Sequence, residues 1–63
     1  MPQITVEGPR IENLEKKRKL AADLTEAAIR AFNLHKEVFV VLIKENLPEN
    51  VAVGGQLIVD IKK

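Results

Sequence analysis

Pro2 is the residue with the clearest potential for reaction chemistry, because it directly follows Met1. Removal of Met1 would leave Pro2 as the amino terminus, with a secondary amine held on a rigid ring. Partial burial disfavours the charged form of such an amine and moves its pKa toward neutrality, where it can act as a general base. A base of this kind can move a proton between the oxygen and a carbon of an enol, if a nearby group neutralises the oxyanion. The alternative is that Pro2 only begins a strand, where its missing N–H is harmless.

Other catalytic groups are scarce in the sequence. Serine and cysteine are both absent, which removes the nucleophiles of serine and thiol enzymes. His35 is the single histidine, and it has no Cys or second His with which to share a metal ion. Gly54 and Gly55 lack the spacing of phosphate-binding loops and are more typical of a hairpin turn. We therefore expect no metal and no cofactor.

Length and charge limit the partners of the chain. The 63 residues include 10 Lys and Arg and 9 Asp and Glu, and the resulting net charge of +1 argues against nucleic-acid binding. Residues 16–19 are all basic, but consecutive helical residues point in different directions and form no single charged face. No apolar run approaches the roughly 20 residues of a membrane span, and the first residues lack the apolar segment of a secretory signal. We expect a cytoplasmic protein that binds neither nucleic acid nor membrane.

The chain is short for a domain that must be stable alone. A chain of this size removes only about 60% of its unfolded surface from water when it folds as a monomer. Disulfides and structural metals are not available, so oligomerisation is the remaining support for a small scaffold. We expect a single domain over residues 1–63 that forms a homo-oligomer.

The elements that must position Pro2 follow from the apolar pattern. Residues 3–6 alternate in polarity and are rich in β-branched side chains, and Gly8-Pro9 ends this first strand. A segment without glycine or proline runs from about Asn13, a good N-cap, to about Phe32 and predicts a helix. At 100° per residue its apolar side chains form one core-facing stripe roughly 140° wide. The members of this stripe are Leu14, Leu20, Ala21, Leu24, Ala27, Ala28, Ala31 and Phe32.

Lys17 is the one charged residue in the middle of that stripe. Its alkyl stem can pack against apolar neighbours while its ammonium escapes past the first helical turn. Lys17 can also act as a structural buttress where the chain enters the helix.

A continuous apolar run at residues 38–43 predicts a second strand that needs cover on both faces. Strand, helix and strand in this order predict two parallel strands with a right-handed crossover, and the helix covers one face. The other face then needs a partner chain. A loop at residues 46–50 leads to a short hairpin of residues 51–53 and 57–59, which we expect to pack on a neighbouring subunit. The predicted fold class is α/β (α+β), a single β-α-β unit with a C-terminal β-hairpin.

Several motifs, in this order and at these spacings, resemble the 4-oxalocrotonate tautomerase family over essentially the whole chain. This family consists of small proteins built from one β-α-β unit and a terminal hairpin. The resemblance is carried by Met1-Pro2 with residues 3–6, by Glu15-Lys16-Lys17 with Leu20, by residues 24–27, by residues 43–45 and by residues 53–55.

The resemblance implies an isomerase that acts without a cofactor. It implies that the processed Pro2 is the catalytic base in the ketonisation of 2-hydroxymuconate, phenylenolpyruvate or a related enol of a 2-oxo acid. It also implies a dimer with a shared four-stranded sheet, and a hexamer formed as a trimer of dimers. The small-molecule enol and further copies of the chain are then its partners.

The substrate-binding residues of the family match this sequence less well. Better-known members have an arginine shortly after the first strand, a second arginine in the second strand of a neighbouring subunit, and an aromatic residue near the hairpin. Without gaps these three positions fall on Glu12, Val40 and Val51. The cations that could replace the missing arginines are Arg10, Lys44 and Lys36, with Arg10 first because it lies closest to the first strand. The pattern indicates a divergent subgroup.

Two other functions remain open on the sequence alone. One is another proline-dependent reaction, such as hydration or dehalogenation, in which a protonated Pro2 acts as an acid. The other is a structural oligomer without catalytic activity, in which Pro2 only begins a strand.

Overall fold

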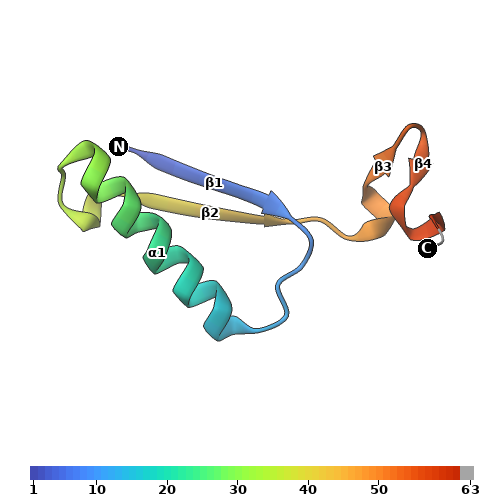
Figure 1. The fold of residues 1–63 in the computed structure, drawn as a ribbon, viewed down its shortest axis with the longest axis horizontal. Coiled ribbons are helices and arrows are strands. Elements are labelled where there is room, and N and C mark those ends of the chain that lie inside the picture. Colours follow the sequence, from blue (N-terminus) through green and yellow to red (C-terminus); the bar gives the residue numbers. More distant parts are fainter. Residues whose placement is uncertain (62–63) are drawn as a thin grey trace.

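The computed structural model describes residues 1–61 and shows a β-α-β unit followed by a small hairpin (Figure 1). This architecture confirms the predicted α+β fold. The helix and strands are β1 (Gln3–Gly8), α1 (Leu14–Phe32), β2 (Val40–Glu45), β3 (Ala52–Val53) and β4 (Gln56–Leu57). Short 3-10 turns lie at Lys36–Val38, Pro48–Asn50 and Ile58–Asp60.

The two long strands are parallel, with Gln3 paired to Val40 and Gly8 paired to Glu45. The ladder begins where the Val40 N–H donates to the Pro2 carbonyl at 3.0 Å, and the Asn46 N–H donates to the Gly8 carbonyl at 2.8 Å at its far end. The prediction of a second strand at residues 38–43 was therefore wrong by two residues. The start of β2 is set by its pairing with β1. Of the two apolar residues before it, Val38 ends a 3-10 turn and Phe39 follows that turn with extended backbone.

Helix α1 has the ends that the sequence predicts. The Asn13 side chain accepts a hydrogen bond from the Glu15 N–H at 2.8 Å, which satisfies one of the free donors of the first turn. At the other end Asn33 takes a left-handed conformation with φ 56°, and its N–H donates to the Ile29 carbonyl at 2.7 Å. Both caps confirm a helix that begins after Asn13 and ends at Phe32.

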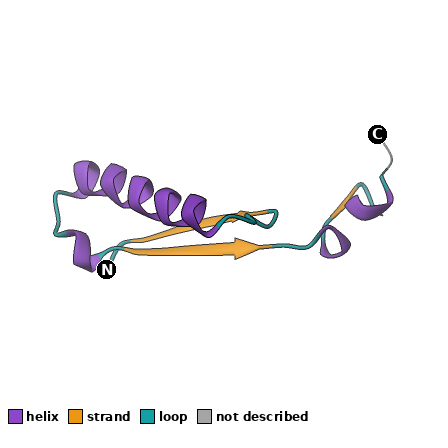
Figure 2. Cartoon of the chain, turned by 90° about the horizontal axis from the view of Figure 1, so that it is seen from below, coloured by secondary structure: helices purple, strands orange, loops and turns teal. Residues whose placement is uncertain are grey.

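The helix covers one face of the two-stranded sheet and leaves the other face bare (Figure 2). Burial alternates along β1 and β2, as expected for strands covered on one side only. The bare face includes Val40, 38% exposed, and Leu42, 41% exposed. In the single chain, one face of the second strand therefore lacks the cover that its apolar residues were predicted to need.

Half of the predicted core-facing stripe is exposed in the single chain. Leu14 and Phe32 are each 58% exposed, and Ala27 and Ala31 are also exposed. A sheet of two strands about 4.8 Å apart is narrower than the apolar stripe of a helix whose diameter is about 10 Å. Only the middle of the stripe meets the sheet, and Ala28 is the one buried residue of the described chain.

The terminal hairpin is confirmed, but it is shorter than predicted. Strands β3 and β4 are antiparallel and contribute two residues each. Gly54 and Gly55 connect them with φ angles of 60° and 83°, a left-handed pair that favours glycine. Ile58–Asp60 forms a 3-10 turn rather than strand, because the Ile61 N–H donates to the Ile58 carbonyl and turns the chain.

The single chain is elongated and rich in exposed apolar surface. Its radius of gyration is 15.2 Å, whereas a compact chain of this length would have about 11 Å. Its accessible surface is 5372 Å², against about 4,000 Å² for a compact monomer of this mass. Within residues 1–61 no helix is long and apolar enough to cross a membrane. The exposed large apolar residues are Met1, Leu14, Phe32, Leu34, Val40, Leu42, Leu47, Val53, Leu57, Ile58, Val59 and Ile61.

Candidate functional site

Pro2 lies half-buried at the start of β1, beside the start of β2. Its carbonyl is held by the Val40 N–H, so the backbone at this position is fixed by the ladder. Met1 precedes it and is 90% exposed, so its removal would disturb no packing in the single chain. The nitrogen of a processed Pro2 would therefore stand at the open end of a rigid strand.

The two aromatic residues of the chain meet at the same end of the sheet. The rings of Phe32 and Phe39 lie 6.0 Å apart at a tilt of 58°. Phe39 directly precedes Val40, so the register of the ladder brings it beside Pro2. An apolar neighbour would disfavour the charged form of a processed Pro2 amine. The sequence analysis did not place Phe39 beside Pro2, although its position just before the second strand could have indicated it.

Of the predicted binding residues, only Val40 lies beside Pro2. Val40 faces the bare side of the sheet and carries no polar group with which to bind a carboxylate. Lys36 is at the same end of the sheet, but it lines a hollow of about 340 Å³ against the helix residues Ala21 and Thr25. Neither residue supplies a cation next to Pro2 in the single chain.

The remaining predicted site residues lie at the opposite end of the sheet. Arg10 follows β1, Lys44 is near the end of β2, and Val51 precedes β3. The length of β1 separates these residues from Pro2 by about 20 Å, since a strand rises about 3.3 Å per residue. Arg10 and Lys44 are both exposed. One chain therefore does not bring Pro2 and these cations together.

An apolar pocket of about 380 Å³ lies at this far end, between the sheet and the hairpin. Its lining includes Val51 and Pro9, the residue before Arg10, while Asn46 and Glu7 supply polar atoms. The Asn46 side chain donates to the Glu7 carboxylate at 2.9 Å and so fixes one wall. The full lining is Glu7, Gly8, Pro9, Asn46, Pro48, Val51 and Ile58.

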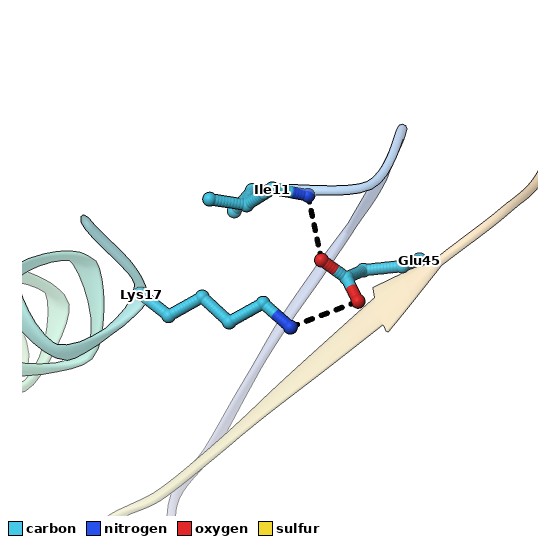
Figure 3. A network of polar contacts seen from close by, with 3 residues as sticks. All are labelled: Ile11, Lys17 and Glu45. Atoms are coloured by element: carbon cyan, nitrogen blue, oxygen red, sulfur yellow. Dashed lines mark hydrogen bonds and ion pairs between the residues drawn. The ribbon is translucent and has the colours of Figure 1, made fainter. Parts of the chain in front are cut away.

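A polar network that the sequence analysis missed anchors the loop between β1 and α1 (Figure 3). One oxygen of Glu45 accepts a hydrogen bond from the Ile11 N–H at 2.6 Å, and the other pairs with the Lys17 ammonium at 2.9 Å. The Ile11 hydrogen bond, followed by the Lys17 hydrogen bond, holds the pKa of Glu45 below its ordinary value of 4.5. The positive charges of Lys17 and Arg10 act in the same direction, against the effect of burial.

The ammonium of Lys17 does not escape past the first turn as predicted. It points across to the end of β2, where Glu45 binds it, and its side chain is 30% exposed. The alternative of a structural lysine at the helix entry agrees with this geometry. A partly buried ammonium is stabilised by a nearby carboxylate. Glu45, at the end of the second strand, was the residue of the sequence that could have indicated this ion pair.

In residues 1–61 no group of three or more His, Asp or Glu side chains is arranged to hold a metal ion. A site without metal or cofactor stays a prediction.

Comparison with known proteins identifies what this arrangement resembles. The family described as "Tautomerase enzyme" matches residues 2–61. YwhB, a homologue of 4-oxalocrotonate tautomerase, is 31% identical with a TM-score of 0.87 over 97% of this chain and 100% of its own. DmpI from Archaeoglobus fulgidus is 37% identical with a TM-score of 0.81 over 94% of this chain and 100% of its own.

A third structure is a heterohexamer 4-oxalocrotonate tautomerase from Chloroflexus aurantiacus. It is 26% identical with a TM-score of 0.83 over 98% of this chain and 100% of its own. A comparison of the sequence with curated proteins gives no match.

Proposed function

The chain belongs to the tautomerase enzyme family, and from this premise we propose that it ketonises small enols of 2-oxo acids with Pro2 as the general base. The observation that carries the proposal is the position of Pro2. It is the second residue of the chain, half-buried at the open end of β1 and beside Phe39. The family match also begins at this residue.

The proposed reaction needs one base and one cation. The neutral amine of the processed Pro2 takes the hydroxyl proton of the enol, and an enolate forms. The same nitrogen then gives a proton to a carbon of the enolate, which yields the keto isomer and restores the amine. Atoms and charges balance without a metal, a cofactor or a second substrate. A cation that binds the substrate carboxylate and faces the developing oxyanion lowers the barrier further.

We assign this cation to Arg10 of another chain. Arg10 and the pocket with Val51 lie about 20 Å from Pro2 of the same chain, as the length of β1 requires. A small enol cannot reach both ends of one chain. In a homo-oligomer, the Arg10 end of one subunit can meet the Pro2 end of another. Lys44, exposed near the same end of the sheet, is the second candidate cation.

The elongated shape and exposed apolar surface of the single chain favour such an oligomer. The hexameric tautomerase from Chloroflexus aurantiacus is similar over nearly the whole chain, and we propose a hexamer here as well. The site is then incomplete in a monomer. We also propose that the protein works in the cytoplasm on a small-molecule substrate, without binding a membrane or a nucleic acid.

The Pro2→Ala variant tests the proposal. The substrates are 2-hydroxymuconate and phenylenolpyruvate, and mass spectrometry first verifies that Met1 is absent from both proteins. We expect the wild type to ketonise at least one enol and the variant to lose a hundredfold or more in kcat/KM, since general-base catalysis contributes about 10²–10⁴-fold. Equal rates would end the proposal. Turnover of 3-haloacrylates without enol ketonisation would favour dehalogenation, in which Pro2 acts as an acid.

A further inference from the structure

We infer that Glu45 and Lys17 form a positioning pair that sets Arg10 for the substrate carboxylate, an inference that rests on the proposed function. Glu45 holds the loop next to Arg10, while Lys17 occupies the carboxylate that would otherwise attract Arg10. Neither residue needs to touch the substrate.

The anchoring of the loop rests on a single carboxylate at the end of the sheet. Glu45 is the last residue of β2, paired with Gly8 of β1, and its side chain is 24% exposed. Its hydrogen bond of 2.6 Å goes to the backbone N–H of Ile11, the residue directly after Arg10. This contact joins the loop to the rigid ladder beside it. It therefore limits where Arg10 can place its guanidinium.

Lys17 explains why Arg10 stays available. Arg10 is close enough for its charge to act on Glu45, yet within residues 1–61 it forms no ion pair. The second oxygen of Glu45 is already taken by the Lys17 ammonium at 2.9 Å. A carboxylate with a partner on each oxygen attracts a further cation less strongly. Lys17 thus leaves the charge of Arg10 free for an external carboxylate.

This arrangement predicts that each single substitution disturbs the position of Arg10 and that the double substitution restores it. In Glu45→Gln the amide can accept from Ile11 or from Lys17, but its NH₂ group must then face the other donor. In Lys17→Met the carboxylate keeps Ile11 but becomes free to bind Arg10. In the Lys17→Met/Glu45→Gln variant the amide oxygen accepts from Ile11, its NH₂ group faces no cation, and no carboxylate competes for Arg10.

The test measures kcat and KM for the enol that the wild type ketonises. We expect each single variant to raise KM tenfold or more, with a smaller fall in kcat, since loss of a charge-assisted bond to the substrate carboxylate costs roughly tenfold to a hundredfold. The double variant should return KM toward that of the wild type. In an Arg10→Ala background, neither single substitution should raise KM further. Thermal unfolding of all variants separates loss of the folded protein from loss of positioning.

The amide of Ile11 gives a readout that does not depend on activity. Its hydrogen exchange should be faster in Glu45→Gln than in the wild type, and slow again in the double variant. The inference is overturned if KM rises equally with and without Arg10, if kcat alone falls, or if Ile11 exchanges equally in all variants. If the wild type ketonises no enol, the proposed function fails, whereas Ile11 exchange still decides whether Glu45 anchors the loop.

Discussion

At the scale of single residues, the chain places the proposed base and the proposed cation at opposite ends of β1. Pro2 lies among apolar neighbours at one end of β1, and Arg10 lies at the other end, next to a network that fixes its loop. This separation suits the two proposed tasks, because apolar surface disfavours the charged form of an amine, while a ligand for a carboxylate needs an exposed cation. Glu45 links the second task to the body of the fold.

The lowered pKa of Glu45 predicts how stability changes with pH. A carboxyl group whose pKa is lower in the folded than in the unfolded state stabilises the fold above its unfolded pKa, which is near 4.5. This contribution is lost as the pH falls through the lowered value. Urea unfolding at fixed protein concentration should therefore show a larger loss of stability below about pH 4.5 for the wild type than for Glu45→Gln.

Glu49 offers a matched control for this pH dependence. It is an exposed acid without an ion pair within residues 1–61. Glu49→Gln should lose stability on acidification as the wild type does. If Glu45→Gln also follows the wild type, Glu45 does not carry the pH dependence assigned to it.

At the scale of the elements, local signals were sufficient where local contacts decide the structure. Asn13 and Asn33 cap α1 through bonds to residues no more than four positions away, so the sequence predicted both ends. The start of β2 depends on Pro2, far away in sequence, and the apolar run alone placed it two residues early. Glu45 was missed for the same reason, since Ile11 and Lys17 are distant in sequence. Pro2 needed no contact to be noticed, because its chemistry follows from its place in the chain.

The cap at Asn13 can be tested directly. Asn13→Ala removes the acceptor for the Glu15 N–H and should lower the free energy of unfolding by about 1 kcal/mol, within the 0.5–2 kcal/mol range of such caps. Urea unfolding at one protein concentration measures the change. The control is Asn50→Ala, whose side chain forms no hydrogen bond within residues 1–61 and which should change stability by less than about 0.5 kcal/mol. Equal losses in the two variants would exclude a capping role.

At the scale of the whole molecule, we propose that the single chain is an incomplete unit. Its radius of gyration is 15.2 Å, and its bare sheet face and projecting hairpin leave apolar surface exposed, as an oligomer would require (Figures 1 and 2). Pro2 and Arg10 lie at opposite ends of β1, so the proposed catalytic site would also be incomplete in a single chain. The proposed function requires each working site to take its base from one chain and its cation from another.

Mixing two impaired variants tests this requirement most directly. Pro2→Ala loses the secondary amine held on the proline ring. Arg10→Ala keeps this amine but should lose tenfold to a hundredfold in kcat/KM, as expected for one charge-assisted bond. The two are unfolded together, refolded as mixed oligomers and checked by native mass spectrometry. Roughly a quarter of the sites then carry both residues, so enol ketonisation should exceed the mean of the two separately refolded variants. Mixed oligomers whose activity equals that mean would contradict a site shared between chains.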